Sequence, residues 1–186
     1  MSVIRKVLPH ESGQIYDHLL RLHADDMRLR FGGVMLKPIA VARYVESIDW
    51  PRSVAIGCWE NERLRGVAQL ALPNPARPWS AAATDAAELA LSVERDLQNI
   101  GIGTQLLTRA LLSARNHMVK RVFMFCIPEN ARMRRVAVKC GLRVAFANGE
   151  VWASTELSPP DQFTVMAEAW TDQLALVDEM IERIAG

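Results

Sequence analysis

The 186-residue chain has few cysteines, no long apolar run and almost no net charge. Its three cysteines, Cys58, Cys126 and Cys140, lack metal-ligand spacing, so we expect free thiols, no disulfides and no bound metal. No run approaches the roughly 18 apolar residues of a membrane span, and the N-terminus lacks a signal peptide's apolar core. A formal net charge of +1 argues against general nucleic-acid binding. These absences predict a cytoplasmic protein without a membrane or nucleic-acid partner.

Hydrophobic periodicity predicts an α/β (α+β) fold in one main domain, residues 1–158. Strand patterns alternate with helix patterns only in the second half of the chain, and hairpins flank that region. We therefore expect a mixed sheet with helices on both faces. The expected strands are 2–7, 53–59, 64–72, 86–93, 121–127 and a pair joined at Asn148-Gly149; the expected helices are 11–23, a segment after Pro38, 103–115 and a segment from Asn130 to near Cys140.

Residues 159–186 form an extra C-terminal segment that begins with Pro159-Pro160. Apolar residues recur there every three or four positions, as in an amphipathic helix. We expect this stripe to cover the domain's own core, and a contact with a second subunit in a homodimer is the alternative. The stripe is Phe163, Met166, Trp170, Leu174, Val177, Ile181 and Ile184.

The segment 98–104 lies between an expected strand and an expected helix. Its glycines, Gly101 and Gly103, let the backbone approach a ligand closely. The N–H groups at the start of the helix, together with the helix dipole, favour a phosphate there. The sequence therefore predicts a site for a phosphorylated cofactor.

The residues next to the glycines exclude two kinds of phosphate-binding loop. A dinucleotide loop needs a third glycine or alanine where Leu106 stands, and an acidic residue where Lys120 and Arg121 stand. A Walker loop needs Gly-Lys-Ser/Thr, which is absent.

The pattern Gln98-x-x-Gly101-x-Gly103 resembles the acetyl-coenzyme A (acetyl-CoA) loop of the GNAT acyltransferase superfamily. Asn130 matches an asparagine that commonly contacts the cofactor in that superfamily, and the similarity extends from about residue 5 to residue 157. Residues 27–31, Met-Arg-Leu-Arg-Phe, resemble a segment of the catalytic domain of bacterial protein lysine acetyltransferases, and Glu88 matches their proposed catalytic glutamate. This resemblance implies a mostly antiparallel central sheet and an N-acetyltransferase.

The resemblance also implies which residues hold acetyl-CoA, the expected co-substrate. The expected cofactor-binding residues are Leu91, Ser92, Val93, Gln98, Asn99, Ile100, Gly101, Ile102, Gly103, Thr104, Asn130 and Arg132. Asn99 and Ile100 stand where the family often has glycine followed by a cation. We therefore expect backbone amides to hold the pyrophosphate, aided by Arg132 or its neighbours on the same helix.

Glu88 is the candidate general base, because acyl transfer from a thioester requires a neutral amine and a carboxylate can remove the ammonium proton. The expected acceptor is a protein lysine, with a small amine or amino acid as the alternative. A non-catalytic acyl-CoA sensor is the alternative of a different class. Ala137 excludes the tyrosine acid that many members of the superfamily have on that helix. We expect the four histidines, His10, His18, His23 and His117, to be solvated surface groups.

Overall fold

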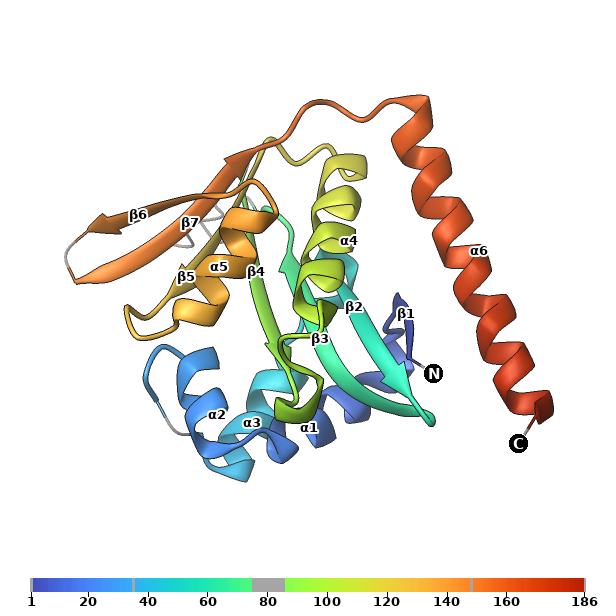
Figure 1. Cartoon of the computed structure of the whole chain (residues 1–186), viewed down its shortest axis with the longest axis horizontal. Helices are drawn as coiled ribbons and strands as arrows, with labels where there is room; N and C mark the ends of the chain where they lie inside the picture. Colours follow the sequence, from blue (N-terminus) through green and yellow to red (C-terminus); the bar gives the residue numbers. More distant parts are fainter. Residues whose placement is uncertain (1, 35, 75–85, 148, 186) are drawn as a thin grey trace.

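The computed structural model describes residues 2–34, 36–74, 86–147 and 149–185, without side chains at 147, 176 and 178–185. A seven-stranded sheet has the order β1-β2-β3-β4-β5-β7-β6, and every neighbouring pair is antiparallel except β4 and β5 (Figure 1). The predicted mixed, mostly antiparallel sheet is confirmed. The strands are β1 (Val3–Lys6), β2 (Ser53–Glu60), β3 (Arg63–Ala71), β4 (Ala86–Val93), β5 (Arg121–Cys126), β6 (Arg143–Ala147) and β7 (Glu150–Glu156).

Helices cover both faces of the sheet. Helix α4 packs on β2, β3 and β4, whereas α1 packs on β3 and α3. Alternation along β3 supplies both cores, because Ala68 and Leu70 face the α4 side and Val67 faces the α1 side. The helices are α1 (Ser12–Arg21), α2 (Ala24–Arg30), α3 (Pro38–Glu46), α4 (Ile102–Asn116), α5 (Ala131–Lys139) and α6 (Gln162–Ala185).

Strands β4 and β5 separate along their length. They pair only from Ala86 to Glu88 of β4, whereas β3 pairs with β4 as far as Val93. The edge of β4 that faces β5 is therefore open from Leu89 to Val93. An open edge inside a sheet presents backbone groups to any extended ligand that enters it.

Local signals in the sequence located most element ends within one or two residues. The strand over 86–93 has the predicted bounds, and α4 begins one residue before the predicted start. Strands β6 and β7 form the predicted hairpin, and its turn residue Asn148 lies outside the described residues. The loop predicted from Pro73 to Asp85 also lies mostly outside them.

The expectation that the stripe on α6 covers the domain's core is wrong. Its described members are largely exposed: Phe163 at 72%, Met166 at 67% and Trp170 at 66% of their surface. The helix lies along β1 and α4, apart from the sheet's covered faces (Figure 1). The neighbouring core is covered by α4, which packs on β2, β3 and β4.

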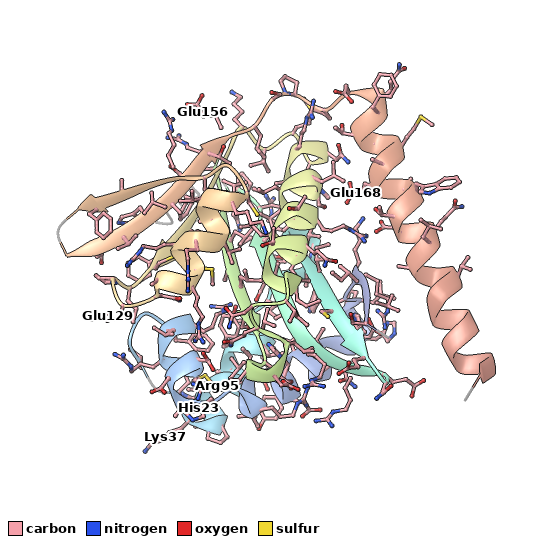
Figure 2. All side chains as sticks on the ribbon, in the orientation of Figure 1. His23, Lys37, Arg95, Glu129, Glu156 and Glu168 are labelled. Carbon is pink, nitrogen blue, oxygen red and sulfur yellow. The ribbon has the colours of Figure 1, made fainter. Side chains whose placement is uncertain are left out.

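Helix α6 instead attaches through its acidic face. Lys6 Nζ of β1 lies 2.9 Å from Glu168 and 2.8 Å from Asp172, and Arg109 of α4 lies 2.8 Å from Asp172. Asn116 of α4 donates to Glu168 at 2.6 Å. Figure 2 shows Glu168 on the side of α6 that faces the domain. Acidic residues of α6 therefore hold this helix against β1 and α4.

Candidate functional site

A cavity of about 430 Å³ lies where β4, α2, the start of α4 and α5 meet. Ten of the twelve predicted cofactor-binding residues line it. The two others do not, because Ile102 is buried in the core and the Ile100 side chain is on the surface. We call this space the donor cavity. Its predicted lining residues are Leu91, Ser92, Val93, Gln98, Asn99, Gly101, Gly103, Thr104, Asn130 and Arg132.

Backbone amides of β4 point toward the donor cavity. The Glu94 N–H donates to the Arg65 carbonyl of the β3 side at 2.9 Å. Hydrogen bonding alternates along an antiparallel strand, so the N–H groups of Leu91 and Val93 face the opposite, open edge. The Val93 carbonyl confirms this direction, because it accepts from Gln98 Nε2 at 2.8 Å. Leu91 and Val93 are thus placed to pair with an extended ligand.

The glycine loop leads from this edge into α4. Gly101 has φ +97° and Asn99 has φ +63°, both in the left-handed region that favours glycine and asparagine. Gly101 is the N-cap residue of α4 and provides no side-chain cap. The first amides of this 15-residue helix are therefore left for solvent or an anion at the positive end of its dipole.

Helix α5 forms the wall opposite the loop. Asn130 caps it, because its Oδ1 accepts from the Met133 N–H at 3.0 Å. Arg132 Nη2 is paired with the Asp26 carboxylate of α2 at 2.6 Å, so it is less available to a phosphate than expected. Arg135 and Lys139 also line the cavity, and neither has an ion-pair partner in the described part of the chain. These two cations are the better complement to a phosphorylated ligand.

A second cavity, of about 230 Å³, lies on the α1–α3 side of the sheet, and we call it the acceptor cavity. Glu88 and Ala90 of β4 line it together with Tyr44 of α3 and Gln69 of β3. Glu88 is exposed, and its carboxylate has no hydrogen-bond or ion-pair partner among the described residues. Asp49 supplies a second carboxylate. Arg30 and Arg52 also line it, so the cavity presents both carboxylates and guanidinium groups to a ligand.

His18 corrects the expectation of four solvated histidines. Its side chain is fully buried, Nε2 lies 2.9 Å from the Ser92 hydroxyl, and Nδ1 lies 3.4 Å from Glu94. Burial lowers the pKa of His18, so the ring is neutral near pH 7. A neutral ring with this geometry donates from Nδ1 to Glu94 and accepts the Ser92 O–H at Nε2. Ser92 is thereby fixed as a strand hydroxyl at the edge of the donor cavity.

Glu94 is the centre of this polar cluster. Burial raises the pKa of its carboxyl, but hydrogen bonds from His18, Arg65 and Arg21 outweigh that effect and lower the pKa to about 2. Arg65 lies 2.7 Å from Glu94 and 2.6 Å from Glu60. The cluster joins α1, β3 and the end of β4.

Among the described residues, no cluster of histidine, cysteine and acidic side chains could hold a metal ion. No helix in the described part of the chain is both long and apolar enough to cross a membrane. Cys58 and Cys126 are buried free thiols, as expected.

The sheet thus opens between β4 and β5 onto a glycine loop and a helix N-terminus. The sequence matches the acetyltransferase (GNAT) family over residues 18–142. The chain therefore belongs to the GNAT acetyltransferase family and is an enzyme of the acyltransferase class. The family expectation is confirmed.

Solved structures share this fold at low sequence identity. The GNAT domain of S. lividans PAT has 19% identity and a TM-score of 0.69, over 83% of this chain and 89% of that one. The yncA acetyltransferase of Salmonella typhimurium, solved with acetyl-CoA, has 17% identity and a TM-score of 0.64, over 87% and 99%. A ribosomal-protein-alanine N-acetyltransferase of Brucella melitensis has 14% identity and a TM-score of 0.63, over 83% and 99%. No curated protein sequence matches this chain significantly.

Sequence reasoning missed several lining residues of both cavities. Asp26, Leu29 and Arg30 reach the donor cavity from α2, a helix whose contact with β4 depends on the tertiary fold. Tyr44 reaches the acceptor cavity from α3. The one signal in the sequence was the Met27–Phe31 segment, which contains Leu29 and Arg30.

Proposed function

We propose that the protein transfers the acetyl group of acetyl-CoA directly to a primary amine, the side chain of a protein lysine, without an acyl-enzyme. One observation supports this most strongly: β4 borders both cavities. Its open backbone edge faces the donor cavity, and its Glu88 side chain faces the acceptor cavity. An enzyme that joins two substrates needs this arrangement of two sites on one rigid element.

The residues of the donor cavity suit coenzyme A. Leu91 and Val93 would pair with the amide groups of the pantetheine arm, and the start of α4 would hold the pyrophosphate. Arg135 and Lys139 add positive charge on the opposite wall. When bound, acetyl-CoA supplies an activated acetyl thioester.

The acceptor cavity suits an amine that must lose a proton. A lysine ammonium has a reference pKa near 10.4, so a neutral amine is scarce at pH 7. Glu88 has no partner in the described part of the chain, and it can therefore accept the ammonium proton directly or through water. No side chain of the lining is assigned as the acid, and water would protonate the departing thiolate.

A free amino acid is a second candidate acceptor. The acceptor cavity contains the guanidinium groups of Arg30 and Arg52 beside its two carboxylates. A substrate that carries both an ammonium and a carboxylate would use both kinds of charge. The side chain of a protein lysine carries no carboxylate to pair with Arg52.

The test compares a set of lysine peptides with free amino acids as acceptors, with product mass as the readout, in the parent and in Glu88→Gln. We expect peptide acetylation by the parent and a loss of about 100-fold or more in kcat for Glu88→Gln. The affinity for coenzyme A, measured by calorimetry, should not change. Unchanged turnover in Glu88→Gln would refute the role of Glu88 as the general base. Tight coenzyme A binding without turnover in the parent would favour a sensor.

Homodimer formation and a cytoplasmic location remain predictions. The exposed stripe Phe163, Met166 and Trp170 on α6 is the surface on which a second subunit would have to pack. Sedimentation of the parent and of Trp170→Ser would test this. A monomer in both samples would exclude the dimer.

A further inference from the structure

Arg30 lies at the boundary between the two cavities. Among the described residues, it alone lines both the donor cavity and the acceptor cavity. It is the last residue of α2, so its long side chain reaches from the helix end toward β4. A group at this boundary lies where the two substrates would meet.

The guanidinium group of Arg30 is fixed before any ligand binds. Its Nη2 donates to the Tyr44 hydroxyl at 2.7 Å, and that hydroxyl donates to Gln69 Oε1 at 2.5 Å. The guanidinium carbon lies 4.9 Å from the centre of the Phe31 ring and 5.5 Å from that of Tyr44. These neighbours hold the cation by a hydrogen bond and by aromatic faces, and neither neutralises it.

The charge of Arg30 is also uncompensated. It has no ion pair with any carboxylate of the described residues, and its Nε is buried without a hydrogen-bond partner. Two arginines near the site differ from Arg30 in this respect, because Arg132 pairs with Asp26 and Arg65 pairs with Glu94. A preorganised cation without a counterion is suited to stabilise negative charge that appears only during a reaction.

We propose that Arg30 is a catalytic residue that stabilises the negative charge on the acyl carbonyl oxygen and then on the departing sulfur. This rests on the proposed acetyl transfer. The amine lone pair forms the C–N bond, the C–S bond breaks, and sulfur leaves with its electron pair as a thiolate. Glu88 takes the ammonium proton before the attack and passes it to water, and it then takes the second proton from the nitrogen that has bonded to the acyl carbon. Arg30 keeps its protons throughout, and it balances the negative charge as Glu88 balances the positive one.

Three variants test the proposal, with kcat, KM for both substrates, coenzyme A affinity and the unfolding temperature measured for each. Arg30→Met should lower kcat by about 100-fold to 1,000-fold, with coenzyme A affinity and unfolding temperature close to those of the parent. Arg30→Ala should show a similar loss, and added ethylguanidinium should restore part of kcat. Arg28→Met is the matched control, because Arg28 is exposed on the same helix and lines neither cavity.

A kcat for Arg30→Met within about threefold of the parent would overturn the proposal. A loss that ethylguanidinium does not relieve and that follows a lower unfolding temperature would overturn it as well. Failure of the proposed function gives a different pattern, namely no acetyl transfer by the parent to any amine. The same variants would then be compared in the slow hydrolysis of acetyl-CoA, in which the same charges develop on oxygen and sulfur.

Discussion

Gly103 offers the sharpest test of the donor cavity. A Cβ at this position would lie 3.7 Å from Leu91 Cδ2 and 3.7 Å from Val136 Cγ2, which is ordinary van der Waals contact. Leu91 and Val136 both line the donor cavity, so the added atom would enter the cavity from the wall of α4. Gly103 is helical, and its backbone needs no left-handed conformation.

Substitution of Gly103 should therefore separate folding from binding. Gly103→Ala should leave the free energy of unfolding unchanged or raise it by up to about 1 kcal/mol, because alanine favours a helix. Gly103→Val adds two more methyl groups to the cavity, and we expect the coenzyme A dissociation constant to rise by roughly 10-fold to 100-fold, about 1.4 to 2.7 kcal/mol. Calorimetry gives the affinity, and thermal unfolding gives the stability.

Two other glycines are matched controls. Gly101 has φ +97°, so Gly101→Ala should destabilise the fold by about 1–2 kcal/mol through backbone strain. Gly13 lies in α1, and a methyl group added there would meet open space, so Gly13→Ala should lower neither the affinity nor the stability. Parental coenzyme A affinity in Gly103→Val would refute the placement of the ligand in this cavity.

Three further predictions concern stability. Asn130→Ala removes the N-cap of α5 and should lower the free energy of unfolding by about 1 kcal/mol in chemical denaturation, whereas Asn130→Asp should retain most of it. Acidification from about pH 7 to pH 3 should lower the free energy of unfolding in two stages. In the first stage His18 is protonated in the unfolded chain but stays neutral in the folded protein, because its pKa is lowered there. In the second stage, below the ordinary pKa of 4.5, Glu94 is protonated in the unfolded chain but stays ionised in the folded protein. Glu94 should account for about 2 kcal/mol of this after screening by solvent, and a pH-independent stability would contradict both assignments. Asp172→Asn should weaken the docking of α6 by about 0.5–1 kcal/mol, seen as faster amide hydrogen exchange in residues 162–175 with no change in β4.

The strand–loop–helix unit from Ala86 to Asn116 was predictable because its signals are local. Glycine at the turn, the apolar run before it and the helical stripe after it all lie within one short segment. The same holds for Asn130, whose capping role follows from its position after Pro128. These local features made most of the donor-cavity lining predictable from the sequence.

The polar partners across the sheet were not predictable in the same way. His18 meets Ser92 over a separation of 74 positions, and nothing near either residue identifies the other. A weaker signal did exist, because His18 follows Ile15 by three residues and precedes the buried Leu19 on the same helix. A histidine on the apolar face of a helix needs a buried partner, which the sequence alone does not name.

Helix α6 shows the opposite error. Its period correctly predicted a helix, but a helix with two useful faces can dock by either one. Lys6 and Arg109 determine which face of α6 docks, because they place cations at the edge of the domain along which α6 lies. Ion pairs between α6 and its neighbours thus set the docking face, and burial of the apolar stripe did not. The period of the stripe contains no information about these ion pairs.

Alternation of side chains along β4 explains how one short strand would serve both substrates of the proposed reaction. Side chains of Glu88, Ala90 and Ser92 point to the α1 side of β4, and those of Leu89 and Leu91 point to the α4 side. The amides of Leu91 and Val93 lie in the plane between these faces and point to the open edge. A one-residue insertion between Glu88 and Leu91 would turn either the carboxylate or the amides away from its cavity. In the proposed reaction, the spacing from Glu88 to the glycine loop is therefore a geometric requirement.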